Sequence, residues 1–281
     1  MEQTFVIGGE LEVRRLGFGA MRVTGSGVWG WPDDREAAVA LLRRARELGV
    51  DLIDTADAYG PETSEYLIAE ALAPHPAGPV IATKGGLVRG GPGDWQPDGR
   101  PAHLRRAVEN SLRRLGRDAI DLYQLHTIDP EVPLEDSIGA LVDMQKAGKI
   151  RHLGVSNFRV EHLERAHKLA TIVTVQNRYS LADRKHEAVV DYCTDHGIGF
   201  IPWYPLDTGK LADEPKLRQI AANYEATPGQ IALAWLLRRS PVMLPIPGTS
   251  SMAHLEENTA ARDLALSDDD FAALSETARL P

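Results

Sequence analysis

The stretch IATKGG, residues 81–86, ends an apolar run with a lysine, at the point where a buried strand would normally finish. Apolar runs of this kind alternate with amphipathic segments along the chain, which is typical of repeated βα units around a parallel sheet. In such folds the reacting groups project from the C-terminal ends of the strands. Lys84 is therefore our first candidate functional residue, and the ends of the neighbouring runs are where its partners should lie.

Eight strand-like runs can be counted in the 281 residues. They are RLGFGAM (15–21), DLIDTA (51–56), PVIATK (79–84), IDLYQLH (120–126), IRHLGVSN (150–157), IVTVQN (172–177), GFIPWYP (199–205) and VMLPIPG (242–248). The segments between them, such as 34–49, 101–116 and 160–170, have apolar residues three and four apart, as helices covering a sheet do. Eight βα units in about 250 residues match a (β/α)8 barrel. The sequence therefore predicts an α/β fold, a TIM barrel, as a single domain over residues 1–281.

Three segments fall outside this repeat. FVIGGELEV (5–13) predicts two short strands around a Gly-Gly turn, a hairpin expected to close the barrel floor. The Gly- and Pro-rich residues 85–101 predict an irregular, functional loop after the third strand, with Trp95 as its apolar anchor. LSDDDFAALSETARL (266–280) predicts a terminal helix capped by Ser267.

Composition excludes several classes of function. The net charge is −9, and no basic stripe suits a phosphate backbone, so no nucleic-acid partner is expected. No apolar run approaches a membrane span, and the N-terminus lacks a leader pattern, which predicts a cytoplasmic protein without membrane contact. Cys193 is the only cysteine, and His152, His162 and His167 lack ligand spacing, so we expect neither a disulfide nor a metal. We expect Cys193 to be a small hydrophobe on a helix.

Four polar side chains stand at or just after the ends of neighbouring strand-like runs: Asp54, Tyr59, Lys84 and His126. A desolvated lysine needs an anion, which Asp54 can supply. The ammonium is expected to lower the pKa of Tyr59 and make it a general acid, while His126 offers an N–H to a substrate carbonyl, with a partner group setting its tautomer. Asp54 and Lys84 alone could form a purely structural ion pair; the other two residues favour catalysis.

The order and context of these four residues resemble the Asp, Tyr, Lys, His tetrad of the aldo-keto reductases, and the resemblance spans nearly the whole chain. GVSNF (154–158) and VTVQNRYS (173–180) match the groups that hold the nicotinamide carboxamide in that family. IPWYPL (201–206) matches the segment that stacks an aromatic ring on the nicotinamide, and IPGTSSMAHLEEN (246–258) matches the adenosine phosphate segment. Within the family, the chain is most similar to the bacterial pyridoxal reductase branch.

The resemblance implies a set of cofactor and substrate residues. The cofactor contacts it implies are Gly19, Ala20, Met21, Asp54, Ser156, Asn157, Gln176, Trp203, Tyr204, Pro205, Leu206, Gly248, Thr249, Ser250, His254, Glu257 and Asn258. The substrate pocket it implies consists of Trp29, Trp31, Tyr59, Trp95 and His126. Gly17 and Gly19 form only a GxG, so a Rossmann site is excluded.

The cofactor expected from the resemblance is NADP(H), with NAD(H) as the alternative. Gly248 and His254 stand where larger vertebrate-type reductases carry the Lys and Arg that grip the 2′-phosphate. Phosphate binding here would instead depend on Thr249, Ser250, Ser251 and the start of the following helix.

The resemblance implies NAD(P)H-dependent reduction of an aldehyde or ketone by a monomeric enzyme, with pyridoxal or another small aldehyde as substrate. Two alternatives stay open. A strand-end lysine in a barrel could form a Schiff base, as in an aldolase using Lys84. A cofactor-sensing regulatory subunit of the same fold is the non-enzymatic alternative.

Overall fold

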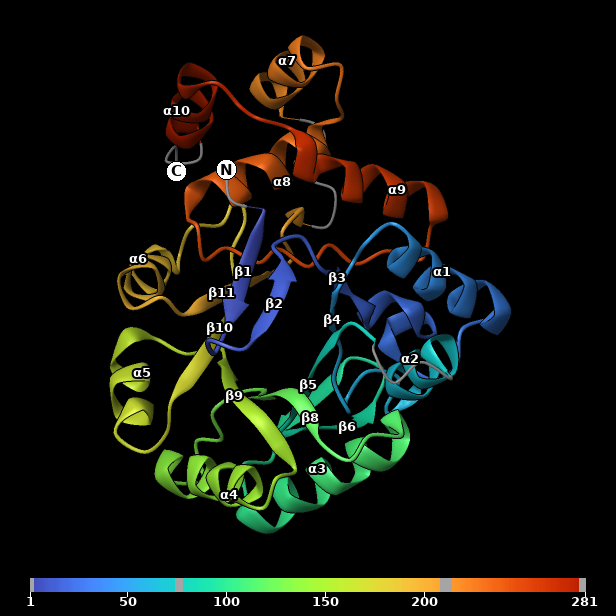
Figure 1. The fold of residues 1–281 in the computed structure, drawn as a ribbon, viewed down its shortest axis with the longest axis vertical. Helices are drawn as coiled ribbons and strands as arrows, with labels where there is room; N and C mark the ends of the chain where they lie inside the picture. The colour runs from blue at the N-terminus through green and yellow to red at the C-terminus, as the bar shows by residue number, and fades with distance from the viewer. Residues whose placement is uncertain (1–2, 74–77, 208–213, 278–281) are drawn as a thin grey trace.

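A curled parallel sheet of seven strands forms most of a barrel (Figure 1). The structure is a computed structural model that describes residues 3–73, 78–207 and 214–277. The strand order is β11-β10-β9-β8-β5-β4-β3, and every pairing is parallel. The bounds are β3 Phe18–Gly19, β4 Leu52–Asp54, β5 Val80–Gly85, β8 Ile120–Leu125, β9 Ile150–Ser156, β10 Ile172–Arg178 and β11 Gly199–Trp203. Seven of the eight predicted strands are thereby confirmed, several of them shorter than expected.

We call the eight segments that form the barrel wall its staves. The eighth stave, residues 242–248, is not a regular strand. It pairs with β11 only around Phe200, whose N–H donates to the Val242 carbonyl at 2.8 Å and whose carbonyl accepts from Leu244 N–H at 2.7 Å. On its other edge the N–H of Gly17 donates to the Pro245 carbonyl at 3.0 Å. Because prolines have no N–H, this segment cannot form a full ladder. It nevertheless fills the gap between β11 and β3, so the fold is the predicted (β/α)8 barrel.

The helices form an outer ring around the sheet, as the amphipathic periodicity predicts (Figure 1). Their bounds are α1 Arg35–Glu47, α2 Thr63–Leu72, α3 Pro101–Leu115, α4 Leu134–Lys146, α5 Val160–His167, α6 Glu187–His196, α7 Pro215–Asn223, α8 Pro228–Arg239, α9 Met252–Ala260 and α10 Asp268–Thr277. The Ser267 hydroxyl accepts from Asp270 N–H at 3.1 Å, which confirms the predicted cap of α10. None of the helices in the described part of the chain has both the length and the apolar character that a membrane crossing requires.

The N-terminal hairpin closes one end of the barrel. Its strands β1 (Thr4–Ile7) and β2 (Leu11–Arg14) pair antiparallel, and Figure 1 shows them lying across the barrel. Ile7, Leu11 and Val13 are buried in one apolar cluster with inward-facing residues of the staves, including Leu52 and Leu122. Burying these side chains stabilises the fold by about 25 cal/mol for each Å² of apolar surface removed from water. The hairpin is therefore a packed floor, as predicted.

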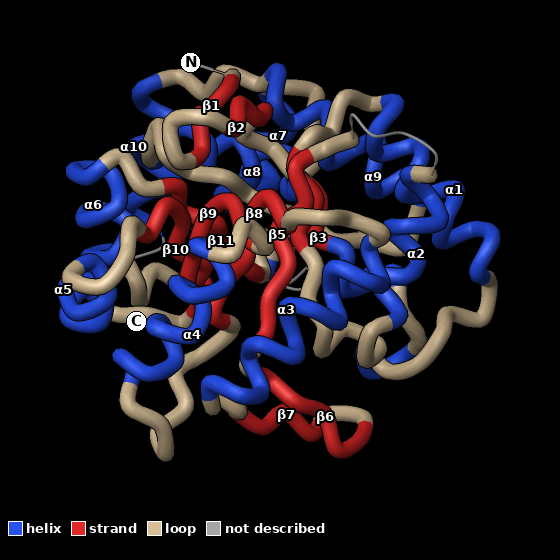
Figure 2. The backbone as a smooth tube through the Cα atoms, turned by 60° about the horizontal axis from the view of Figure 1, so that its bottom comes forward, coloured by secondary structure: helices blue, strands red, loops and turns tan. Residues whose placement is uncertain are grey.

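The segment 85–101 is more regular than its composition indicates. It contains an antiparallel hairpin, β6 (Leu87–Gly91) and β7 (Asp94–Pro97), with Gly93 at a φ of 76° in the turn. The prediction of an irregular loop was therefore wrong. Glycine and proline are compatible with a short two-stranded ribbon because they can occupy its turn and its unpaired edges. Figure 2 shows this hairpin at the end of the barrel opposite β1 and β2.

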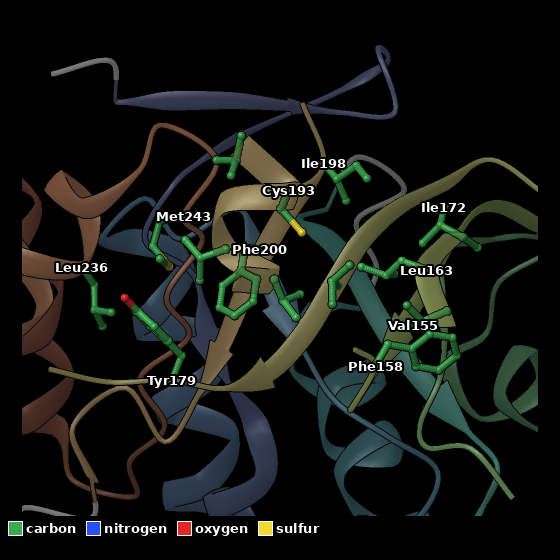
Figure 3. Packing of buried hydrophobic residues seen from close by; sticks show 14 of the residues in the cluster. Val155, Phe158, Leu163, Ile172, Tyr179, Cys193, Ile198, Phe200, Leu236 and Met243 are labelled. Carbon is green, nitrogen blue, oxygen red and sulfur yellow. The ribbon is translucent and has the colours of Figure 1, made fainter. Parts of the chain in front are cut away.

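The main apolar core lies between the sheet and its outer helices. Figure 3 shows part of it, with Phe200 of β11 beside Tyr179 and Cys193. Tyr179 stacks on Trp235 of α8 at 6.2 Å between ring centroids, and meets Phe200 edge-on. Cys193 is fully buried on α6, and burial raises the pKa of its thiol to about 12. It therefore packs as an inert hydrophobe, as predicted.

Candidate active site

A cavity of about 960 Å³ opens at the C-terminal ends of the staves. Its wall combines the ends of β4, β8, β9, β10 and β11 with the loop before α9 and the β6–β7 hairpin. Three tetrad residues line it, namely Asp54, Tyr59 and His126, and Lys84 lies directly behind them. The predicted gathering of these four residues at one mouth is what the structure shows.

The Lys84 ammonium is fully buried and forms three short contacts. Its Nζ lies 2.6 Å from Asp54 Oδ1, 2.9 Å from the Thr55 carbonyl and 3.2 Å from the Tyr59 hydroxyl. Burial alone would lower the pKa of Lys84, but Asp54 and then Tyr59 outweigh it and raise that pKa above its usual value. Lys84 is thus a permanent cation held beside the phenol.

The second oxygen of Asp54 connects the ion pair to the inner strand faces. Oδ2 accepts from Gln176 Nε2 at 2.7 Å and from Gln124 Nε2 at 3.2 Å. Gln176 was predicted, whereas Gln124 was missed. The signal for it was available, because Gln124 precedes His126 by two residues and alternate residues of a strand share a face. Asp54 therefore fixes Lys84 and two amides at once.

Tyr59 differs from expectation in the direction of its pKa. Burial raises the pKa of its phenol, and the nearby Lys84 ammonium lowers it by less than burial raises it. The expected net lowering by Lys84 was wrong, because a side chain only 7% exposed loses much of the water that would solvate a phenolate. Tyr59 is consequently a phenol in this state, the protonated form that an acid needs before it reacts.

His126 is held neutral. Burial, followed by the Lys84 charge, brings the pKa of its imidazole well below the usual range. The ring centroid lies 5.9 Å from that of Tyr59, at 82° to it. Among the described residues, Nδ1 is buried and has no hydrogen-bond partner, so the expected partner that sets the tautomer was not found. A neutral imidazole still provides one N–H donor.

The cofactor residues implied by the resemblance lie almost entirely along this cavity. Those that line it are Gly19, Met21, Asp54, Ser156, Asn157, Gln176, Trp203, Tyr204, Pro205, Leu206, Gly248, Thr249, Ser250, His254, Glu257 and Asn258. Ala20 is fully buried and does not line the cavity. The Trp203 indole N–H donates to Asn157 Oδ1 at 3.2 Å, which connects the predicted platform with the predicted amide.

Other residues of the cavity wall were missed. They are Arg22, Leu87, Thr227, Pro228, Gly229, Ile246 and Pro247, whereas Ser251, which also lines the cavity, was predicted as a phosphate contact. Thr227 caps α8, which begins at Pro228, and its hydroxyl accepts from Gln230 N–H at 3.2 Å in a capping box. The sequence TPGQ carries that helix-start signal. The Thr227 hydroxyl also donates to Glu257 at 2.5 Å, so the start of α8 meets the side of α9 at the wall.

The three tryptophans implied for the substrate pocket are distributed unequally. Trp95 lines the cavity next to Tyr59 and His126. Trp29 does not line it, and its ring lies 5.5 Å from the Arg89 guanidinium. Trp31 is 47% exposed and stacks on Tyr66 outside the cavity. Among the described residues, no three His, Cys, Asp or Glu side chains are placed to hold a metal ion.

The fold and the site define a (β/α)8-barrel protein with Asp54, Tyr59 and His126 in the wall of a cavity at its C-terminal mouth and Lys84 directly behind them. The sequence pattern of the aldo/keto reductase family matches residues 15–279, and the chain belongs to that family of oxidoreductases.

Individual relatives agree with this placement. The chain is 44% identical over 282 residues to pyridoxine 4-dehydrogenase of Escherichia coli, covering 98% of both chains. It is 52% identical over 269 residues to an uncharacterized oxidoreductase of Schizosaccharomyces pombe, covering 95% of this chain and 88% of the relative. The structure of an aldo/keto reductase from Klebsiella pneumoniae in complex with NADP and acetate matches with a TM-score of 0.87 and 29% identity, over 100% of this chain and 97% of that one.

Proposed function

We propose that this protein reduces a small aldehyde to the primary alcohol, with NADPH as the hydride donor. One observation carries the proposal: the Tyr59 hydroxyl lies 3.2 Å from the Lys84 ammonium at the wall of a cavity that the phenol itself lines. A phenol paired with a buried cation is poised to lose a proton into the cavity, because the cation stabilises the phenolate that results.

The cavity wall fits a nicotinamide dinucleotide in the chemistry of its groups. The hydroxyl of Ser156 and the amides of Asn157 and Gln176 line the part of the wall that contains the tetrad, where a carboxamide needs donors and acceptors. Trp203 offers an aromatic face beside them. The loop before α9 supplies backbone N–H groups and hydroxyls, as a phosphate requires. The NADP bound to the Klebsiella relative supports NADP(H) over the alternative, NAD(H).

The reaction needs one hydride and one proton. When bound, the reduced nicotinamide supplies the hydride to the carbonyl carbon, and the protein supplies the rest. Tyr59 gives its proton to the carbonyl oxygen, and the phenolate that remains is stabilised by Lys84 at 3.2 Å. Asp54 holds Lys84 in place at 2.6 Å. The neutral His126 orients the carbonyl by donating an N–H.

The substrate we favour is pyridoxal or a similar flat aldehyde. The similarity to pyridoxine 4-dehydrogenase, at 44% identity over nearly the whole chain, supports this choice. The cavity wall next to Tyr59 also includes the apolar side chains of Leu87 and Trp95, which suit an aromatic ring better than a polyol.

Both alternatives are less well supported. A Schiff base requires a neutral amine that faces the substrate. Lys84 is instead an ammonium paired with Asp54, its pKa is raised, and it does not line the cavity. A cofactor-sensing subunit needs no proton donor, whereas Tyr59 and His126 both line the cavity.

A kinetic screen tests the proposal. The full chain would be assayed for loss of NADPH and of NADH absorbance with pyridoxal, benzaldehyde, propanal and a ketone, with the Tyr59→Phe variant in parallel. We expect turnover of pyridoxal and preference for NADPH in the wild type, and almost none in the variant. Cofactor binding without turnover of any carbonyl would favour the sensor, and a borohydride-trapped adduct on Lys84 would favour the aldolase.

We also infer that the enzyme acts as a monomer in the cytoplasm. The single, unpaired Cys193 fits a reducing compartment, and a monomer is the state that the resemblance to the family implies. Light scattering during gel filtration would test the oligomeric state, and fluorescent tagging of the chromosomal copy would test the location.

A further inference from the structure

Three aromatic rings enclose the point where the substrate carbonyl would lie. Trp95 of β7 meets Tyr59 edge-on at 6.3 Å and His126 edge-on at 6.5 Å, and the latter two are 5.9 Å apart. The proposed acid and the proposed orienting group therefore share Trp95 as a third wall. That wall stands on a hairpin with few buried apolar residues of its own, so its position needs another support.

Arg89 provides that support. It is the cross-strand neighbour of Trp95 in the β6–β7 ladder, and its guanidinium lies 3.6 Å from the centre of the indole ring. A planar guanidinium stacked on an aromatic face restricts the ring as well as attracting it.

The same guanidinium joins three segments of the chain through backbone carbonyls. Within the hairpin it donates to Asp94 O at 3.1 Å and to Gly91 O at 3.3 Å. In the loop before α1 it donates to Val28 O at 3.0 Å and to Gly27 O at 3.3 Å. Next to Tyr59, the proposed acid, it donates to Ala58 O at 3.1 Å.

One of these bonds is made to a residue in an unfavourable backbone conformation. Val28 has a φ of 57°, in the left-handed region that a β-branched residue rarely adopts. Among the described residues, Arg89 has no carboxylate within ion-pair distance. Its N–H groups instead donate hydrogen bonds to backbone carbonyls. Five carbonyls at fixed directions match the five donors of an arginine and exceed the three of a lysine.

We propose that Arg89 is a positioning residue that fixes Trp95 against the site of Tyr59 and His126, and that this fixed wall makes the enzyme prefer flat aromatic aldehydes to short aliphatic ones. The inference depends on the carbonyl reduction proposed above. A loose indole would still exclude water, but it would no longer present a fixed face to an aromatic ring.

The main test compares two aldehydes. For Arg89→Met we expect the ratio of kcat/KM for benzaldehyde to kcat/KM for propanal to fall about tenfold, mostly through the KM of benzaldehyde. The NADPH Kd should stay within about twofold, since Arg89 does not line the cavity. Arg105→Met, which removes an exposed arginine paired with Asp143 on the outer helices, is the matched control and should leave the ratio unchanged. An unchanged ratio in Arg89→Met would overturn the inference.

A double-mutant cycle separates positioning from a general structural role. Trp95→Leu should lower the same ratio about tenfold, and adding Arg89→Met to it should lower the ratio no further. If the two losses multiplied instead, Arg89 would not be acting through Trp95. Arg89→Lys keeps the charge but loses the stacked plane and two donors, so an intermediate ratio is expected; it replaces the methionine variant should that one not fold.

A fluorescence measurement is independent of turnover. The difference in emission between wild type and Trp95→Phe reports Trp95, and Arg89→Met should make that component more accessible to acrylamide. If no aldehyde were reduced by the wild type, the proposed function would fail while this measurement still decided whether Arg89 holds Trp95. A Trp95 component with unchanged quenching would refute the positioning role.

Discussion

Thr83 and Lys84 are consecutive residues of β5, and each meets a buried carboxylate on a different side of the sheet. On the inner side, Lys84 Nζ lies 2.6 Å from Asp54. On the outer side, the Thr83 hydroxyl donates to Glu65 of α2 at 2.6 Å, and Arg114 of α3 donates to the other oxygen of Glu65, also at 2.6 Å. We call Asp54, Tyr59, Lys84 and His126 the inner cluster, and Thr83, Glu65 and Arg114 the outer cluster.

The two clusters have similar chemistry but different access. Both contain a buried cation and a buried carboxylate, with Glu65 and Lys84 each fully enclosed. Tyr59 and His126 of the inner cluster line the cavity, whereas no member of the outer cluster does. The comparison teaches that a buried ion pair does not by itself mark an active site. What marks it is a proton-carrying group that the pair supports and that also reaches the cavity.

The largest effect is expected from replacing Tyr59, the proposed acid of the inner cluster. Tyr59→Phe keeps the ring and removes the proton, so kcat should fall by about 10²–10⁴-fold. The NADPH Kd and the melting temperature should stay close to wild type, because the packed ring is retained. Stopped-flow turnover and fluorescence titration would measure both quantities. Near-normal kcat would assign the acid to another residue.

The next largest effect is a loss of stability, expected when the outer cluster is disrupted. Arg114→Met leaves Glu65 buried without its cation, which should lower the free energy of unfolding by about 3–5 kcal/mol. In the molecules that remain folded, kcat/KM should change by less than about threefold, because Arg114 does not line the cavity.

Urea titration and turnover on the same preparation would measure this contrast. Arg105→Met, on an exposed pair, is the control and should cost less than about 1 kcal/mol. A large loss of turnover at unchanged stability would mean that the outer cluster belongs to the active site.

A third cluster, around Glu187, is only half-buried. It extends the comparison to an ion-pair cluster that is partly exposed to solvent. Glu187 accepts from Tyr179 at 2.8 Å and from Arg184 and Arg239 at 2.7 Å each. Burial alone would raise the pKa of Glu187, but these donors bring it down to about 2. A lowered carboxyl pKa contributes stability above the unfolded value of about 4.5 that is lost as the pH falls towards 2. Glu187→Gln should therefore cost about 2 kcal/mol near pH 7, after allowance for solvent screening.

Urea titrations of wild type and Glu187→Gln at several pH values would follow this loss. The gap between them should narrow steadily below about pH 4.5. A gap that stayed constant with pH would show that shape, and not charge, accounts for the loss.

The smallest expected effect is that of pH on kcat in the neutral range. Burial moves the pKa of Tyr59 up and that of His126 down, so the inner cluster keeps a protonated phenol and a neutral imidazole across the neutral range. The kcat for reduction should vary by less than about twofold between pH 6 and 8. An acid limb with a midpoint near pH 6.5 that disappears in His126→Gln would contradict the neutral state assigned here.

The sequence was sufficient for the barrel and for most of the residues at its mouth. Strand-end positions such as Lys84 and His126 follow directly from the length of the apolar runs, and alternation along a strand would also have given Gln124. Motif matches placed Ser156, Gln176 and Trp203 on the same cavity.

What the sequence could not give depends on burial and on irregular backbone. The direction of the Tyr59 pKa follows from the balance between desolvation and Lys84, which only enclosure decides. The β6–β7 hairpin and the outward position of Trp31 depend on bonds from Arg89 and on stacking with Tyr66, contacts between segments far apart in the chain. Composition carries no trace of such contacts.

The proline-rich eighth stave makes the join between the first and last staves one-sided. The N–H groups of Gly17 and Gly19 donate to Pro245 and Pro247 at 3.0 and 3.5 Å, and neither proline can donate in return. Amide hydrogens at this join should therefore exchange with solvent before those of the β5–β8 ladder do. Gly19 and Gly248 also border the cavity. A dinucleotide bound in the cavity would therefore contact both sides of this join, and slower exchange of the Gly17 and Gly19 amides would report its binding.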